Sequence, residues 1–327
     1  MSTPALPATM RVLERGWLSS NCVLFVNDDA GDDASVLVDT GYGSHAAQTV
    51  ALVEHALKSA GRQRLARVVN THLHSDHCGG NAALKKAHAC RITIPAGYAD
   101  AVRTWDDDAL MFESTGQQCE RFDFDSTVAA GDMQTWGGLA WQALAAPGHD
   151  DDSLIFFCER EGILISADAL WENGSGAIFP VKTRPPEFAA AQATLALIGS
   201  LAVRLVIPGH GAPFADAAGA LQRAKSRLDH LAGEPERNAR HVAKVLLKFK
   251  LLEVQRMPLA GVVELFRAVP ILALLNDTMR WDAAEFAHNT ASSLVRAGAA
   301  RIEDGVLVDA EGNRNAPIGG GNMSAHA

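Results

Sequence analysis

The chain has 327 residues, of which 48% are hydrophobic, and a formal net charge of −9 at pH 7. This length fits one large domain plus a smaller one, and the composition supplies a sizeable core, which excludes general disorder. The acidic charge argues against a general nucleic-acid binder.

Two features of the sequence bear on location. No stretch approaches about 18 uninterrupted apolar residues, and residues 1–10 lack a long apolar core, so we expect neither a membrane span nor a signal peptide. The five cysteines are odd in number and scattered, which favours a reducing compartment over a disulfide framework. We therefore expect a cytoplasmic protein without a membrane partner.

The first 130 positions alternate short apolar runs with turn residues. Strands are predicted at 11–13, 21–26, 35–38, 66–69 and 91–94, and helices at 44–60 and 80–89. Several early strands close together indicate an antiparallel start to a sheet. Residues 96–126 break this rhythm, and we expect an insertion of one or two helices that forms part of a substrate wall.

The strand rhythm returns after Thr127 and ends near residue 215. Strands are predicted at 139–145, 153–158, 162–166 and 204–207, a helix at 186–201, then helices at 216–233, 236–254, 258–267 and 282–297 and a hairpin at 300–309. This order predicts an α/β fold with two facing sheets and helices outside, a four-layer αββα sandwich, in residues 10–215. A smaller helical domain follows at 216–310, and the Gly-rich tail 311–327 is expected to be disordered.

The segment 68–81 holds the densest group of polar residues. An apolar strand is followed by His72, His74, Asp76 and His77 within six positions, and then by Gly79-Gly80. We expect His72 and His74 to face one metal ion and Asp76 and His77 to face a second, about 3.5–4 Å away. The two glycines are expected to let the backbone turn tightly into a helix. The alternative is a His-rich surface loop.

Three more candidate ligands stand at the ends of later strands. His149 follows Pro147-Gly148, His210 follows Pro208-Gly209, and Asp168 ends an apolar strand. Taken alone, each of these residues is also compatible with a turn that its side chain caps, without any metal ion. Together with the first segment they indicate one shared site, because polar residues gather where buried strands of a layered α/β fold reach the surface.

This pattern resembles the metallo-β-lactamase-fold hydrolases over about residues 10–215. The resemblance implies that His72, His74 and His149 hold one metal ion, that Asp76, His77 and His210 hold the other, and that Asp168 bridges them. It also implies that Asp39, in Asp39-Thr40-Gly41, steadies the metal loop from behind, and Thr71 is a candidate for similar work.

Two bound divalent cations would lower the pKa of a bridging water towards ~7, and the resulting hydroxide would attack an ester, thioester, lactam or phosphodiester. Asp76 is the candidate for moving the proton. Zinc is the expected metal, with iron or manganese as alternatives.

Lys182 and Arg184 are candidate contacts for a substrate carboxylate or phosphate, unless they lie in a solvated loop. The acidic run 150–152 is expected to be solvated.

The C-terminal helices offer a second clue to the substrate. Arg237, Arg240, Lys244 and Lys248 form a basic stripe opposite an apolar one, which fits either a phosphate-bearing substrate, such as a CoA thioester or RNA, or a plain surface helix. Helices followed by the 300–309 hairpin resemble a winged helix, and the whole arrangement resembles the glyoxalase II and endoribonuclease-like branches of the family.

Three functions remain open. The first is a hydrolase of a small ester or thioester, which the acidic charge and compact chain favour. The second is a metal-dependent endoribonuclease, supported by the basic stripe. The third is a metal-binding sensor or effector with incidental hydrolysis. The sequence leaves the substrate, the metal, the oligomeric state and the role of the C-terminal domain undetermined.

Overall fold

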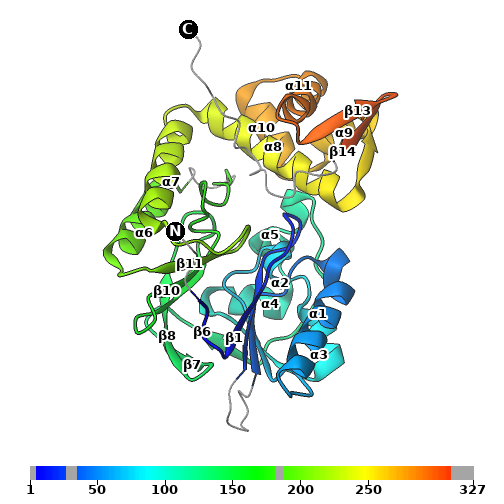
Figure 1. Ribbon diagram of the computed structural model, residues 1–327. Helices are drawn as coiled ribbons and strands as arrows, with labels where there is room; N and C mark the ends of the chain where they lie inside the picture. Colours follow the sequence, from blue (N-terminus) through cyan, green and yellow to red (C-terminus); the bar gives the residue numbers. More distant parts are fainter. Residues whose placement is uncertain (1–4, 27–34, 181–186, 311–327) are drawn as a thin grey trace. The chain divides into compact units, whose positions relative to one another are not determined.

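Two β-sheets lie face to face in the computed structural model, which describes residues 5–26, 35–180 and 187–310 (Figure 1). The first sheet has the strand order β1 (Met10–Leu13), β2 (Cys22–Val26), β3 (Ser35–Val38), β4 (Arg67–Val69), β5 (Arg91–Pro95) and β6 (Ser126–Val128). Its first three strands pair antiparallel and the rest pair parallel. This confirms the predicted antiparallel start.

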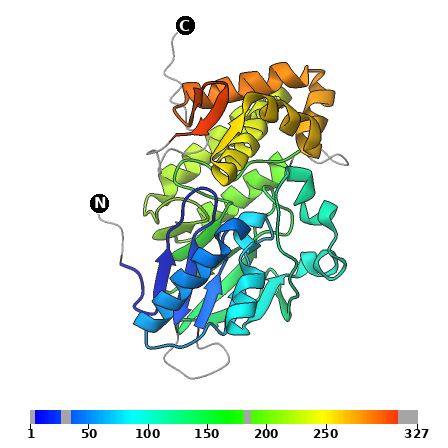
Figure 2. The same cartoon turned by 90° about the vertical axis from the view of Figure 1, so that its right-hand side faces the viewer.

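The second sheet has the order β11 (Leu205–Pro208), β10 (Ile163–Ala167), β9 (Leu154–Cys158), β8 (Leu139–Ala145) and β7 (Met133–Trp136). Only β10 and β11 pair parallel, because α6 (Phe188–Ser200) connects them. α6 lies outside this sheet with α7 (Ala217–Ala232) next to it, whereas α1 (Ala46–Ser59) and α3 (Asn81–His88) cover the outer face of the first sheet (Figures 1 and 2). The predicted αββα sandwich is confirmed.

Strand residues alternate between two hydrophobic clusters. In β2, Val23 and Phe25 belong to the cluster between the sheets, while Cys22, Leu24 and Val26 belong to the cluster under α1 and α3. Both faces of the strand are therefore buried, which is why β2 is a continuous apolar run rather than an alternating one. Trp136 and Trp141 fill the space between the sheets from the second sheet.

The insertion between β5 and β6 contains short helices, as predicted. They are η2 (Ala96–Tyr98), α4 (Ala99–Thr104), α5 (Asp107–Leu110) and η3 (Glu113–Thr115). Contacts divide the chain into two compact units, and the main change from one to the other falls between Leu228 and Asp229, inside α7. Residues 113–117 and 177–180 also belong to the second unit.

The second unit consists of α8 (Pro235–Val254), β12 (Arg256–Pro258), α9 (Leu259–Ala268), α10 (Pro270–Met279), α11 (Ala283–Arg296), β13 (Ala300–Glu303) and β14 (Val306–Asp309). The hairpin β13–β14 is where the sequence places it, and β12 adds a third strand beside β14. The likeness to a winged helix stays a prediction. Among the described residues no single helix is long and apolar enough to cross a membrane, and only the pair α9–α10, bent by 83°, passes by length and composition.

The predicted basic stripe on α8 is wrong at Lys248. This side chain is buried, and its ammonium donates to the Ala299 carbonyl at 2.8 Å and pairs with Asp309. Arg240 pairs with Glu236 and lies 4.6 Å from the ring centre of Trp281. Arg237 and Arg240 remain exposed, each paired with a neighbouring glutamate, so the stripe loses Lys248 but not its first two cations.

Candidate metal centre

The loop after β4 is held by hydrogen bonds to its backbone. It leads into α2 (Ser75–Cys78), a single helical turn too short for its last carbonyls to find partners within the helix. The His77 carbonyl accepts from the Thr40 amide at 2.8 Å and from Asn70 Nδ2 at 3.1 Å, and the Asp76 carbonyl accepts from the Ser20 amide at 2.9 Å. These bonds fix where the side chains of α2 point.

Gly79 and Gly80 serve a different purpose from the one predicted. Their φ angles are −62° and −88°, which any residue adopts, so no special turn requires glycine here. A Cβ on Gly79 would lie 2.4 Å from the Gly43 amide nitrogen, and one on Gly80 would lie 2.5 Å from the Thr40 carbonyl oxygen. The glycines are needed because the chain after β3 packs directly against α2.

The first group of candidate ligands consists of three imidazoles. His72 Nε2 lies 3.2 Å from His74 Nδ1, which lies 2.8 Å from His149 Nε2. The ligand atoms of the three residues all lie within 4.8 Å of one another. Two of these histidines come from the loop after β4, and the third follows β8 in the other sheet.

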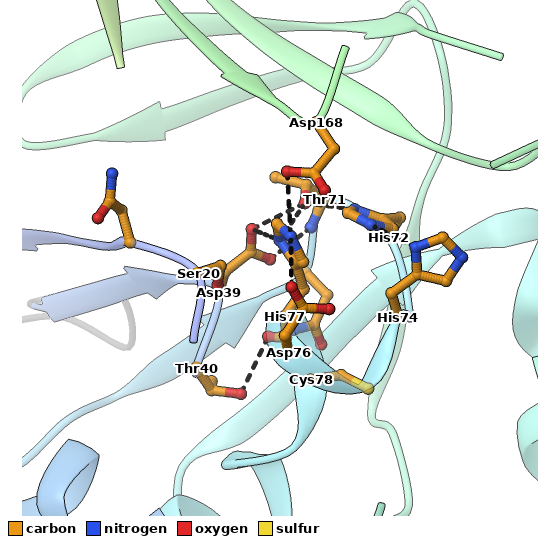
Figure 3. A network of polar contacts seen from close by, with 12 residues as sticks. Ser20, Asp39, Thr40, Thr71, His72, His74, Asp76, His77, Cys78 and Asp168 are labelled. Atoms are coloured by element: carbon orange, nitrogen blue, oxygen red, sulfur yellow. Dashed lines mark hydrogen bonds and ion pairs between the residues drawn. The ribbon is translucent and has the colours of Figure 1, made fainter. Parts of the chain in front are cut away.

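The second group joins Asp76, His77, Asp168 and His210 within the same 4.8 Å limit. His210 Nε2 lies 3.0 Å from Asp76 Oδ2, and His77 Nε2 lies 3.3 Å from Asp168 Oδ1. The other oxygen of Asp168, Oδ2, lies 3.4 Å from His149 Nε2 in the first group. Figure 3 shows Asp168 reaching from the second sheet towards His77. Its two oxygens therefore face the two groups, as a bridging carboxylate requires.

Asp39 and Thr71 lie behind the two groups of candidate ligands (Figure 3). Asp39 follows β3 with φ 59°, in the left-handed region that aspartate tolerates better than most residues. Its carboxylate accepts from the Thr71 amide at 2.9 Å and from the Thr71 hydroxyl at 2.8 Å, and it lies 2.8 Å from His77 Nδ1. The Thr71 oxygen lies 3.1 Å from His72 Nδ1. These contacts turn Nε2 of both histidines towards the groups.

The charges in the site favour a cation at the second group. Burial lowers the pKa of His77, but the Asp168, Asp39 and Asp76 carboxylates outweigh it and raise that pKa well above its usual range. Burial raises the pKa of Asp168, but His77 and His210 outweigh it and hold that pKa well below its usual range. Burial also lowers the pKa of His72 and of His74, so these two rings are neutral at pH 7.

This donor set fits two divalent ions. His77 Nδ1–H donates to Asp39, and its Nε2 is buried without a hydrogen-bond partner and faces the carboxylates of Asp76 and Asp168. The raised pKa keeps a proton on Nε2 in the metal-free protein, between carboxylates that attract positive charge, and a divalent cation can take the place of that proton. Histidine and aspartate in this combination suit zinc, and also iron or manganese.

Two indoles at the second group were missing from the sequence prediction. Trp171 Nε1 donates to Asp168 Oδ1 at 3.1 Å, and the Trp17 ring stacks on His210 with 5.4 Å between ring centres and 11° between planes. Trp171 is only three residues after Asp168, so its nearness in the sequence could have pointed to a place at the same group. Trp17 is far from His210 in the chain, and no local pattern connects them.

The acidic run 150–152 is not wholly solvated, contrary to the prediction. The Asp150 side chain is 11% exposed, and one of its oxygens lies 3.7 Å from His74 Nε2.

Cys78 is buried, with its sulfur 3.8 Å from that of Cys119. Lys182 and Arg184, the candidate substrate contacts, lie outside the described residues, as does the tail 311–327.

The family model of the metallo-beta-lactamase superfamily matches residues 15–210, which is more than half of the chain. The chain belongs to the metallo-beta-lactamase superfamily. The matched range contains all seven residues of the two groups.

Curated relatives of this superfamily member include the hydroxyacylglutathione hydrolase of Nitrobacter winogradskyi, 29% identical over 45% of this chain and 52% of the relative. That of Rhodopseudomonas palustris strain BisB5 is 32% identical over 36% of this chain and 38% of the relative. The chain therefore spans about half, or less, of the length of these relatives.

Solved structures with the same fold include a metallo-beta-lactamase family protein from Thermus thermophilus, with TM-score 0.55, 21% identity and coverage of 93% of this chain and 100% of the other. A beta-lactamase domain protein from Burkholderia ambifaria has TM-score 0.58, 21% identity and 94% coverage of both chains. These likenesses show the fold.

Proposed function

We propose that this superfamily member is a dinuclear-metal-dependent hydrolase of a small ester or thioester. The observation that carries the proposal is the placement of Asp168, whose two oxygens face two separate groups of buried nitrogen and oxygen donors. Zinc is the metal we propose, because three neutral imidazoles in one group favour it. We also propose a cytoplasmic location, since all five cysteines are free thiols.

When bound, two divalent cations supply a water of lowered pKa and a positive field for the oxygen that becomes negative at the attacked carbonyl. The protein's own residues orient the reacting groups and transfer protons. Asp76 lies in contact with His210 and His77 and is buried, so its carboxylate is placed to accept the proton released by the attacking water. Burial raises the pKa of Asp76, but His77 and His210 outweigh it and lower that pKa, which keeps the carboxylate ionised.

The thioester is the preferred substrate class for two reasons. The curated relatives carry the name hydroxyacylglutathione hydrolase, which denotes a thioesterase, although the match covers only part of them. The alternative of RNA has less support than the sequence suggested, because Lys248 of the basic stripe is buried, although Arg237 and Arg240 are exposed. A metal-binding sensor with incidental hydrolysis is the remaining alternative.

Turnover by the zinc-loaded protein tests the proposal on three substrates: a hydroxyacyl glutathione thioester, a lactone and a short RNA. We expect hydrolysis of the thioester and its abolition in His74→Ala. The exposed His55→Ala is the matched control and should keep full activity. Full activity of His74→Ala would refute the metal mechanism, cleavage of RNA alone would favour the nuclease, and no turnover of any substrate would favour the sensor.

A further inference from the structure

A histidine that binds a metal through one ring nitrogen usually donates the proton on its other nitrogen to a fixed acceptor. Asp39 is that acceptor for His77, and the Thr71 hydroxyl is that acceptor for His72. His74 differs because its Nδ1 faces the group, which leaves Nε2–H pointing to the other side of the ring.

Asp150 lies on that side. Its Oδ2 is 3.7 Å from His74 Nε2, and both side chains are 11% exposed. The other oxygen, Oδ1, accepts hydrogen bonds from the Tyr98 hydroxyl and from the Asp152 amide at 3.0 Å. The two oxygens therefore have separate roles: Oδ1 fixes the carboxylate in place, and Oδ2 faces the imidazole.

Tyr98 connects this carboxylate to the metal loop a second time. It is the last residue of η2, directly after β5, and it is 5% exposed. A backbone hydrogen bond links its phenol to Leu73, the residue between His72 and His74. One phenol thus holds both the backbone next to His74 and the carboxylate opposite its ring.

We infer that Asp150 is a positioning residue that holds His74 in the Nε2–H tautomer and in the ring orientation a metal ion needs, and that Tyr98 fixes Asp150 for this task. The inference rests on the proposed metal centre but not on the proposed substrate. When His74 gives its Nδ1 lone pair to a cation, Nε2–H becomes a stronger donor, and its attraction to Asp150 increases.

The competing explanation is that Asp150 only caps the loop through the Asp152 amide. Asp150→Asn separates the two explanations. The amide oxygen still accepts from Tyr98 and Asp152, so the cap is kept. The amide NH₂ replaces Oδ2 and faces Nε2–H, so the negatively charged oxygen opposite His74 is lost. The exposed neighbour Asp151→Asn removes the same charge one residue away and is the matched control.

The test is zinc binding by the full chain, measured by competition with a chromophoric chelator, with thermal unfolding of the metal-free protein alongside. We expect the wild type and Asp151→Asn to bind two zinc ions per chain with equal affinity. Asp150→Asn should lose about 10–100-fold in affinity for one of the two ions, with an unchanged unfolding temperature when metal-free. Tyr98→Phe should lose less than Asp150→Asn.

A second readout is the visible absorption of the cobalt-substituted protein, which reports ligand geometry at the ion. We expect Asp150→Asn to change the spectrum and Asp151→Asn to leave it unchanged. Wild-type zinc affinity and an unchanged cobalt spectrum in Asp150→Asn would overturn the inference. A lowered unfolding temperature with unchanged zinc affinity would assign Asp150 to the loop cap and would also overturn it. Failure of the wild type to bind zinc would instead refute the proposed metal centre.

Discussion

Thr71→Val removes one hydroxyl from behind the metal groups and keeps the shape of the side chain. That hydroxyl donates to Asp39 at 2.8 Å and lies 3.1 Å from His72 Nδ1, and all three residues are buried. Since the single hydroxyl proton goes to Asp39, the oxygen is the acceptor for His72 Nδ1–H. Valine replaces neither contact.

The expected loss follows from these two contacts. A hydrogen bond to a carboxylate contributes about 1.5–3 kcal/mol, and a buried N–H left without a partner costs about 1–3 kcal/mol. The two losses share one residue and do not add fully, and the extra buried methyl group offsets about 0.8 kcal/mol. We therefore expect Thr71→Val to lower the free energy of unfolding of the metal-free protein by about 3 kcal/mol. For a unit of this size that is a fall of about 6–12 °C in the unfolding temperature.

Urea unfolding of the chelator-treated protein measures this loss, with fluorescence of the buried Trp136 and Trp141 as the signal. Thr71→Ser is the matched control, because it keeps the hydroxyl and loses only a methyl group, at a cost of about 1 kcal/mol. We also expect Thr71→Val, but not Thr71→Ser, to weaken zinc binding about 10–100-fold. Equal urea midpoints for the two variants would show that the hydroxyl does not stabilise the site.

Three further predictions concern other parts of the molecule. Gly209→Ala would place a Cβ 2.2 Å from Asp168 Oδ1, so we expect it to lose bound zinc on metal analysis, whereas Gly199→Ala, whose Cβ would meet only an ordinary contact at 3.7 Å, should keep it. Burial lowers the pKa of His77, but the neighbouring carboxylates outweigh burial and raise that pKa well above 6.5. Protonated His77 therefore stabilises the metal-free protein fully below pH 6.5, and this stabilisation is lost as the pH rises through the raised pKa. The urea midpoint should therefore fall on the alkaline side, and less steeply in His77→Gln; parallel curves would contradict this. Lys248→Met leaves Asp309 without its cation and should destabilise the second unit by about 2–4 kcal/mol in calorimetry, a cost that an unshifted transition would disprove.

The sandwich could be predicted because its strands are short apolar runs that end in polar residues, and because helical spacing is strong in segments such as α1 and α8. α10 was not predicted. Its Pro270 occupies the first helical position, where its missing N–H costs nothing. Lys248 was misplaced because helical spacing says which face a residue is on but not what the rest of the fold packs against that face.

The seven candidate ligands could be named in advance because they follow the ends of buried strands. A polar side chain at such a place usually caps a turn or contributes to a site. Tyr98 and Asp150 could not be named in advance. They are 52 positions apart, and Asp150 begins a run of three aspartates that looks like solvated surface. Their contact arises only when two separate loops are folded together, which local periodicity does not report.

Each sheet of the sandwich is built from one continuous stretch of chain, β1 to β6 before residue 129 and β7 to β11 after residue 132. The consequence concerns the order of synthesis. Asp39, Thr71 and His77 all lie in the first stretch, so their hydrogen bonds can form while Asp168 and His210 are still to be translated, at about 5–20 residues per second. During that interval the inward face of the first sheet, with Val23, Phe25 and Val36, has nothing to cover it. A nascent chain stalled near residue 130 should therefore bind chaperones strongly, and one stalled after the second sheet has emerged should not.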